Sequence, residues 1–463
     1  MTAALDVVEF LLTARVYEKH GDLDENDLPP AHRSALWADD GVPRPPKTTE
    51  DAVREGSGVD DPWDAVSGLM FTDRDTFAGN VSLVDDELAI DWFVERADAD
   101  RVRENPVLAF VLDDEFDVDY EAAREANRPV QADPQYIDGL LGEYFDGDDE
   151  EMLDLVEVRS PAEIDVTLDD IVLTDEQEAE ISKVAKAIEH RDYLATIGLS
   201  EIGKLLFVGP PGTGKTSTAR GLAHQLDLPF VEVKLSMITS QYLGETAKNV
   251  EKVFEVAKRL SPCILFMDEF DFVATTRTGD EHNAIKRAVN TLLKSIDEVS
   301  LVNDDVLLIG ATNHPDELDA AAWRRFDEIL SFPRPDEGMR AEILEVVTRE
   351  LDVEGFDPQE LAAETDGLTG SDLRLVLREA VLDALVEDRT TLTQADLVDA
   401  VEDFEDRDHL RNLDTLEEAI DDPDAAAANG GQAHDHDHDH GEGDGHDHGE
   451  GDGHDHGRDR DAE

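Results

Sequence analysis

Apolar and polar positions divide the chain into regions of different texture. Residues 1–160 contain short apolar runs, at 7–12, 88–94 and 107–112, broken by acidic and proline-containing stretches. From 164 to 335, apolar runs of strand length alternate with helical patterns, which predicts a parallel sheet covered on both faces by helices. The expected strands are Leu205–Val208, Phe230–Val233, Ile264–Met267, Val306–Ile309 and Ile329–Phe332.

The pattern changes again after residue 335. Apolar side chains then recur at helical spacing, as in Leu373, Leu377 and Ala380, so that 336–412 is expected to be entirely helical. We therefore predict an α/β domain over 161–335 with a small helical domain attached.

In 1–160, the alternation at 80–84 and the run at 88–93 suggest strands, and we expect an α+β domain there. This domain is a candidate reader of substrates or adaptors. Residues 421–463 carry no large apolar side chain, and we expect 413–463 to be a disordered tail.

Charge excludes several classes of partner. The 463 residues include 113 Asp and Glu but only 40 Lys and Arg, a formal net charge of −73. Nucleic acid and anionic membrane surfaces require clustered basic side chains, so neither is an expected partner. No apolar run is long enough to span a bilayer, and the acidic residues Asp6 and Glu9 argue against a secretory signal. The single cysteine, Cys263, rules out an internal disulfide, and a cytoplasmic protein is predicted.

The acidity itself has two interpretations. It is typical of proteins from cells that accumulate salt, where a screening length of about 3 Å at molar ionic strength makes such a surface tolerable. The alternative is a function that repels acidic molecules. On the first interpretation, transfer from molar KCl to dilute buffer should abolish folded structure, because the carboxylates then repel one another. Circular dichroism that is unchanged by this transfer would contradict it.

The strongest local motif is a glycine-rich loop between an expected strand and an expected helix. Its residues are Gly209, Pro210, Pro211, Gly212, Thr213, Gly214, Lys215 and Thr216, followed by Ser217. Glycines let backbone N–H groups approach phosphate oxygens, and the positive end of the following helix faces the same anion. This Walker A pattern predicts that Lys215 reaches the outer phosphates and that Thr216 binds Mg²⁺. A turn that merely connects strand to helix is the alternative.

A pair of carboxylates ends the apolar run at 263–267. Asp268 is expected beside Thr216, where it would hold Mg²⁺, and Glu269 is expected to point toward the terminal phosphate and activate water. An Asp-Glu pair after an apolar run also occurs without function. Its place one strand-helix unit after the glycine-rich loop favours the catalytic interpretation. Cys263 is expected to be a buried strand residue rather than a reactive thiol.

With these motifs in order, residues 165–405 resemble the AAA family of AAA+ ATPases, in its single-module form. The resemblance implies ATP hydrolysis on a P-loop NTPase sheet with a small helical lid domain. It gives Asn313, after the strand 306–309, the role of orienting the attacking water or contacting the terminal phosphate, although an isolated Asn before His-Pro is more often a turn former. It also identifies Arg324 and Arg325 as arginine fingers supplied by a neighbouring subunit, whose planar cation suits phosphate. A site shared between subunits implies a ring, and a hexamer in particular.

Two further segments resemble parts of the family's nucleotide pocket. Gly370-Ser371 stands where other branches carry an arginine, so no arginine is expected from the same chain. The segment around Ile171 resembles the backbone that contacts adenine, although Val172-Leu173 replaces the usual glycine pair. ATP with Mg²⁺ is the expected nucleotide.

The segment 236–250 suggests what the ring acts on. Tyr242 and Leu243 precede Gly244 and resemble the family's pore loop, where an aromatic and an aliphatic residue grip an extended polypeptide. Packing of Tyr242 beneath its own loop is the alternative. We expect an ATPase that remodels, unfolds or disassembles protein substrates. A loader or switch that changes a partner without threading it, and a non-catalytic or metal-responsive assembly, are alternatives.

The tail contains histidines alternating with aspartates. Imidazole and carboxylate both bind Ni²⁺ and Zn²⁺, and a flexible chain can bring several together. A solvated acidic tail without metal is an equal alternative. The candidate ligands are His434, His436, His438, His440, His446, His448, His454 and His456.

Overall fold

The computed structural model describes residues 2–407 apart from 39–40, 76–78, 200–201, 236–245, 272–281, 319 and 406. The chain divides into two units, Met1–Val401 and Glu402–Glu463, and of the second only 402–405 and 407 are described. Among the described residues, no helix combines the length and the apolar character that crossing a bilayer requires.

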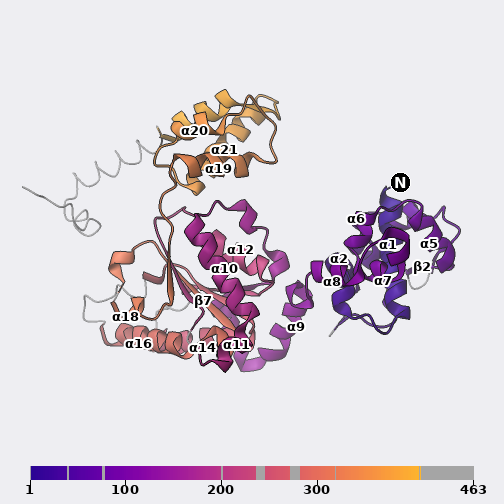
Figure 1. Cartoon of the computed structure of the whole chain (residues 1–463), viewed down its shortest axis with the longest axis horizontal. Coiled ribbons are helices and arrows are strands. Elements are labelled where there is room, and N and C mark those ends of the chain that lie inside the picture. Colours follow the sequence, from indigo (N-terminus) through magenta and orange to yellow (C-terminus); the bar gives the residue numbers. More distant parts are fainter. Residues whose placement is uncertain are drawn as a thin grey trace, which may run out of the picture. The chain divides into compact units, whose positions relative to one another are not determined.

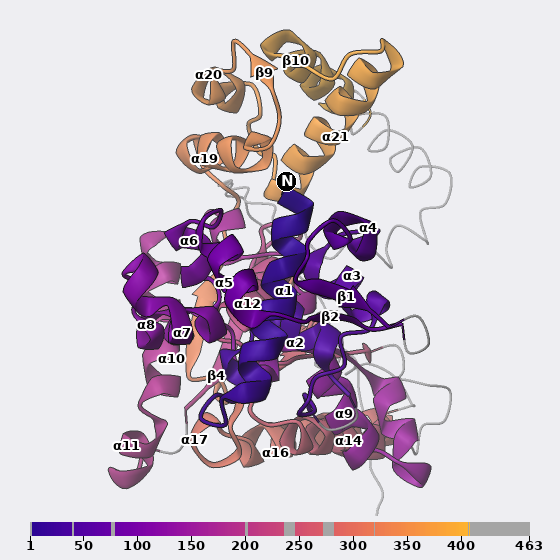
Figure 2. The same cartoon turned by 90° about the vertical axis from the view of Figure 1, so that its right-hand side faces the viewer.

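The N-terminal part is built around one long helix. Helix α1 (Thr2–Lys19) runs through the middle of the surrounding helices (Figure 2). Every residue from Val7 to Leu12 is buried, which fits a helix with neighbours on all sides. The surrounding helices are α2 (Pro30–Leu36), α3 (Glu50–Ser57), α4 (Pro62–Val66), α5 (Asp86–Val94), α6 (Ala99–Arg103), α7 (Pro106–Phe116) and α8 (Tyr120–Ala126).

One strand expected in this part is wrong. Strand β2 (Val81–Leu83) pairs antiparallel with β1 (Thr72–Arg74), but the run at 88–93 lies in α5. The side chain of Asp85 caps this helix by accepting a hydrogen bond from the Leu88 N–H at 3.1 Å. Ala89 and Phe93, four positions apart, are both fully buried. Capping and the spacing of buried residues therefore favour helix over strand.

The central sheet has six strands in the order β3-β5-β6-β7-β4-β8. Five are parallel, and β3 (Val156–Arg159), which precedes the boundary expected at residue 160, joins antiparallel at the edge next to β5. The parallel strands are β4 (Lys204–Val208), β5 (Phe230–Val233), β6 (Cys263–Met267), β7 (Val306–Thr312) and β8 (Glu328–Ser331).

Helices cover both faces of this sheet (Figure 1). In β6, Cys263, Leu265 and Met267 pack on the face of α14 (Thr246–Arg259) and α16 (His282–Glu298). Ile264 and Phe266 point to the opposite face, which α10 (Asp175–Glu189) and α12 (Lys215–Gln225) cover. Burial on both faces explains why this strand is apolar at every position.

The prediction of an entirely helical lid region is wrong. The region contains α19 (Glu337–Thr348), α20 (Pro358–Ala363), α21 (Gly370–Val386) and a helix that begins at residue 394, but β9 (Val353–Glu354) and β10 (Leu392–Thr393) form a short parallel pair. The remaining elements are α9 (Pro134–Tyr144), α11 (Arg191–Thr196), α17 (Leu301–Asp304), α18 (Ala320–Trp323), and the 3₁₀ turns Glu25–Asp27, Val130–Ala132, Gly147–Leu155, Pro161–Glu163, Leu168–Asp170 and Pro315–Glu317.

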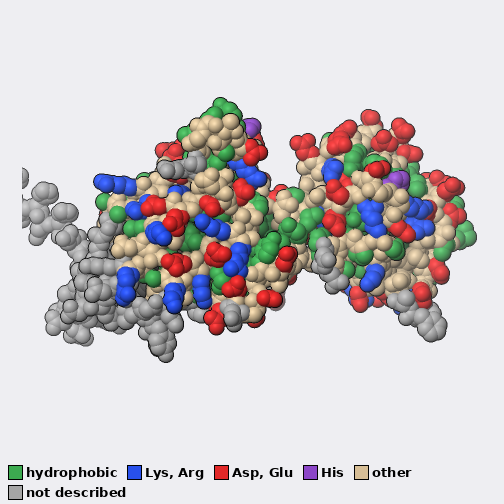
Figure 3. Space-filling view, turned by 90° about the horizontal axis from the view of Figure 1, so that it is seen from below, with side chains coloured by type: hydrophobic (Ala, Val, Ile, Leu, Met, Phe, Trp, Pro, Cys, Tyr) green, Lys and Arg blue, Asp and Glu red, His purple; other side chains and the backbone are tan. Residues whose placement is uncertain are grey.

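The acidic side chains are scattered rather than gathered. On the face shown in Figure 3, Asp and Glu side chains lie across the surface with Lys and Arg between them. On this face, the acidic side chains do not form one separate patch. This distribution fits the interpretation of the net charge of −73 as a property of the whole surface.

Candidate nucleotide site

The glycine-rich loop connects strand β4 to α12. Gly209 lies so close to Phe332 that a Cβ atom there would stand 2.0 Å from the Phe332 carbonyl oxygen. Gly214 precedes the first residue of α12 with φ 98°, a conformation that side chains with a Cβ rarely adopt. The loop therefore needs glycine at both positions. It leaves the N-terminal N–H groups of α12 without helical acceptors, an arrangement suited to an anion.

Lys215 is the first residue of α12. Its Nζ donates hydrogen bonds to the carbonyl oxygens of Gly209 and Pro210, each at 2.7 Å. Burial lowers the pKa of this amine, and the carboxylates of Asp268 and Asp271 offset part of the effect. The lysine is thus held within the loop, where a phosphate would be a stronger partner than a carbonyl oxygen.

The ends of β4, β6 and β7 bring the polar residues together, because carboxyl ends of parallel strands share one edge of the sheet. The Thr216 hydroxyl donates to Asp268 Oδ2 at 2.9 Å, so these two oxygen-bearing side chains lie side by side. Hydroxyl and carboxylate oxygens are ligands that Mg²⁺ accepts. The residues present therefore fit a magnesium ion bound with the triphosphate.

Glu269 follows directly, but it does not line the pocket. Its side chain is exposed, and its N–H donates to Asp268 Oδ1 at 2.8 Å. Its φ of 48° is in the left-handed region, a strained conformation for a residue with a Cβ. Strain of this kind is often found at functional positions.

Asn313 lies at the end of β7 and lines the pocket. Its Oδ1 is buried and has no hydrogen-bond partner within the described part of the chain. A buried acceptor without a donor is costly, and a bound water molecule would satisfy it. The neighbouring Thr312 hydroxyl donates to Asp271 Oδ1 at 2.6 Å, a link between the ends of β7 and β6 that the sequence motifs do not reveal.

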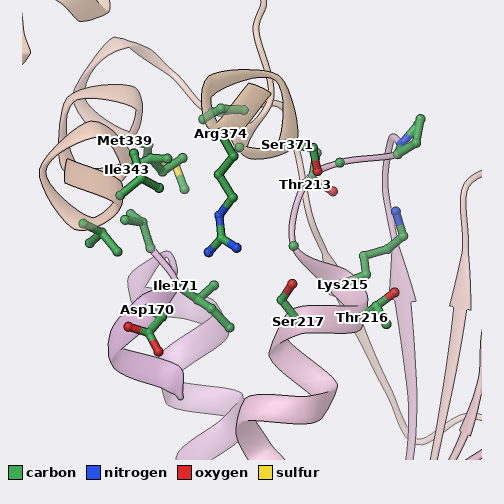
Figure 4. A pocket seen from close by; sticks show the side chains of 18 of the residues that line it. Asp170, Ile171, Thr213, Lys215, Thr216, Ser217, Met339, Ile343, Ser371 and Arg374 are labelled. Carbon is green, nitrogen blue, oxygen red and sulfur yellow. The ribbon is translucent and has the colours of Figure 1, made fainter. Parts of the chain in front are cut away.

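The pocket itself has a volume of about 320 Å³ and two unlike walls. One wall is the loop with Pro211, Gly212, Thr213, Gly214, Lys215, Thr216 and Ser217. The other is mainly apolar, with Ile171 facing Met339 and Ile343 of α19 (Figure 4). A flat apolar group fits the second wall and an anion fits the first, as a nucleotide requires.

The lid closes over the loop through specific contacts. The Ser371 N–H at the start of α21 donates to the Gly212 carbonyl oxygen at 3.2 Å. A Cβ at Gly212 would stand 2.5 Å from the Thr369 hydroxyl oxygen, so the two segments nearly touch. On the other side, Arg349 of the lid forms an ion pair with Asp170, which lines the pocket.

The expectation that the chain supplies no arginine to its own pocket is wrong. Arg374 lies one helical turn after Gly370 on α21 and lines the pocket beside Ile171 and Ser217 (Figure 4). The family motif at 370–371 does not include this position. The helical spacing of four residues is the signal that places Arg374 on the same face as Gly370.

The two adjacent arginines have different surroundings, and neither lines the pocket of its own chain. Arg325 donates to the carbonyl oxygens of Leu293 and Ala321 at 3.0 and 2.5 Å and pairs with Asp297. Arg324 is exposed and forms no hydrogen bond or ion pair with any residue that the structure describes. Of these two arginines, Arg324 is the one whose guanidinium has no partner among the described residues.

Some predicted residues lie outside the described part of the chain. These are the pore-loop residues Tyr242 and Leu243 and the eight tail histidines. Among the described residues, no group of His, Cys, Asp and Glu is arranged to hold a metal ion. A role for the tail in binding Ni²⁺ or Zn²⁺ stays a prediction from sequence.

Comparison with known proteins agrees with this geometry. Residues 205–334 match the family model described as "ATPase family associated with various cellular activities (AAA)", and 355–399 match the AAA+ lid domain. An uncharacterized AAA family ATPase of Sinorhizobium fredii is 40% identical over 235 residues, which cover 50% of this chain and 70% of the relative.

Archaeal relatives are similar over the same region. The proteasome-activating nucleotidases of Methanococcus maripaludis and Pyrococcus horikoshii are 35% and 38% identical over 242 and 232 residues, about half of this chain. The matches cover 60% and 58% of those two proteins.

Proposed function

The chain belongs to the AAA family and is an ATP hydrolase, and from this premise we propose that it forms a hexameric ring in the cytoplasm that unfolds, remodels or disassembles proteins. One observation supports the proposed ring. Arg324 is exposed, has no partner within the described residues and does not line the pocket of its own chain. A cation of this kind can serve a second protomer's nucleotide.

Each residue of the site has a role in this proposal. Lys215 and the N–H groups of α12 hold the phosphates, while Thr216 and Asp268 hold Mg²⁺. Mg²⁺ bound by these two residues would neutralise charge on the phosphate oxygens. Asn313 Oδ1 accepts a hydrogen bond from the attacking water and orients it, and Glu269 accepts the proton that this water loses. Arg324 of the neighbouring protomer stabilises the charge that develops on the transferred phosphoryl group.

The proposal that proteins are the substrate rests on two supports. Two of the relatives have names that describe nucleotidases that activate a proteasome. The segment with Tyr242 and Leu243 resembles a loop that grips an extended polypeptide. An exposed aromatic ring contacts side chains of many kinds, so it suits substrates of varied sequence.

A direct test uses a folded fluorescent protein that carries an unstructured extension. At molar KCl with ATP and Mg²⁺, fluorescence should fall in the presence of the purified full chain, and size-exclusion chromatography should show a hexamer. A monomer that hydrolyses ATP at full rate would contradict the proposal of a ring. Steady fluorescence together with a normal ATPase rate would instead favour a loader or switch that acts without threading.

The Tyr242→Ala variant separates these two modes of action. We expect it to retain basal ATPase activity, because Tyr242 belongs to none of the sequence motifs expected to bind nucleotide, and to lose unfolding of the fluorescent protein. The Tyr144→Ala variant, altered at a tyrosine of α9 whose side chain is 40% exposed, is the matched control and should unfold the substrate normally. Undiminished unfolding by Tyr242→Ala would assign this ring to packing within its own loop.

A further inference from the structure

The nucleotide pocket contains an arginine of its own chain that no motif assigns. Arg374 extends from α21 into the pocket, and its guanidinium points toward Ile171 of the apolar wall and Ser217 of α12 (Figure 4). In a bound nucleotide, the link between the base and the phosphates must cross the space between these two walls. The guanidinium therefore stands next to the path of the phosphate chain.

Arg374 differs from the other arginines of the lid. It forms no hydrogen bond or ion pair with any residue in the described ranges. The others are engaged: Arg340 with the carbonyl oxygens of Ala362 and Pro335, Arg349 with Asp170, Arg378 with Glu379 and Arg389 with Asp396. In a chain with 113 acidic residues, a cation that faces a pocket without a carboxylate partner indicates a ligand that supplies the anion.

The base of this side chain is held in place. The Thr369 hydroxyl and backbone N–H donate to Asp372 Oδ2 at 2.7 and 2.8 Å, so the first turn of α21 is capped in both directions. The Ser371 N–H joins the same turn to the Gly212 carbonyl oxygen of the loop. As long as the lid is closed, these contacts fix the backbone of the turn that precedes Arg374 next to the loop.

We propose that Arg374 binds the phosphate chain of the nucleotide from within the same protomer and thereby holds the lid closed over it. This inference rests on the proposed nucleotide site. A guanidinium is planar, always charged and presents several N–H donors, and phosphate oxygens match this geometry better than any group of the apolar wall. With Lys215 on the loop and Arg374 on the lid, one bound nucleotide bridges both parts of the protomer.

Binding measurements on the full chain at molar KCl test the proposal. We expect Arg374→Ala to bind ATP and ADP about tenfold or more weakly than wild type, since hydrogen bonds to charged groups contribute at least this much. Binding of adenosine, which has no phosphate, should be unchanged. Arg374→Lys should recover part of the affinity for ATP. The control Arg378→Ala, one turn along α21, should bind all three ligands as wild type does.

Each other outcome has a defined meaning. Equal losses for adenosine and ATP would assign Arg374 to stacking on the base or to packing, and unchanged ATP binding would remove any role; either result overturns the proposal. If wild type itself bound no ATP, the proposed nucleotide site would fail as a whole. Without ligand, Arg374→Ala should melt at the wild-type temperature, because the side chain has no described partner to lose, and ATP should raise its melting temperature less than that of wild type.

Discussion

Replacement of Glu269 by Gln is expected to lower kcat for ATP hydrolysis by about 10²–10⁴-fold, the range typical for loss of a general base. The change removes a proton acceptor but keeps the size of the side chain and the backbone with φ 48°. Binding of ATP should persist, because Lys215, Thr216 and Asp268 form the pocket and Glu269 lies outside its wall. Single-turnover hydrolysis and equilibrium ATP binding together measure the two effects.

The control for this experiment is Glu255→Gln on α14. Glu255 forms only a surface ion pair with Arg259, and such pairs contribute little to stability. This variant should hydrolyse ATP at the wild-type rate. A Glu269→Gln variant that turned over ATP normally would show that another group activates the water. One that failed to bind ATP would instead give Glu269 a structural role.

The second large effect is expected at Arg324. Substitution by Ala should lower kcat by about 10³–10⁵-fold, the contribution of arginine fingers in related phosphoryl transfers, and leave thermal stability unchanged. The adjacent Arg325→Ala should act differently. This variant loses hydrogen bonds to Leu293 and Ala321 and the pair with Asp297, so its free energy of unfolding should fall by about 1–3 kcal/mol. Thermal melting and ATPase rates on both variants separate the two roles.

Mixing of inactive variants tests whether Arg324 acts between protomers. In a ring that contains both Glu269→Gln and Arg324→Ala subunits, some interfaces combine an intact Glu269 with an intact Arg324 from the neighbour. ATPase activity should therefore reappear in the mixture, although each variant alone is inactive. A mixture that stays inactive, or an Arg324→Ala variant with the wild-type rate, would contradict the shared site.

Local sequence patterns were sufficient to predict the central sheet and the family of the chain. The five expected parallel strands occur close to their expected positions. Burial on both faces makes β6 apolar throughout and β7 buried at every position, whereas β8 at the edge is mostly exposed. The edge strand β3 and the pair β9–β10 escaped prediction, since two to four residues carry too little periodicity to be recognised. In the N-terminal part, the apolar run at 88–93 is compatible with either a strand or a helix. The helix cap at Asp85 and the burial of Ala89 and Phe93 decide in favour of the helix.

The sequence alone determined which residues form the candidate phosphate-binding loop, because the motif consists of the loop's own backbone and the helix that follows. The glycines, the start of the helix and the lysine all lie within nine consecutive positions, so the motif can be recognised locally, although the close approach of Phe332 to Gly209 is a distant contact. The tertiary structure alone decided how the arginines differ. Arg324 and Arg325 are neighbours in the chain, yet only packing against Leu293, Ala321 and Asp297 engages one and leaves the other available. Arg374 enters the pocket only because the lid folds back onto a loop some 160 residues earlier. Contacts between segments so far apart in the sequence cannot be predicted from local spacing.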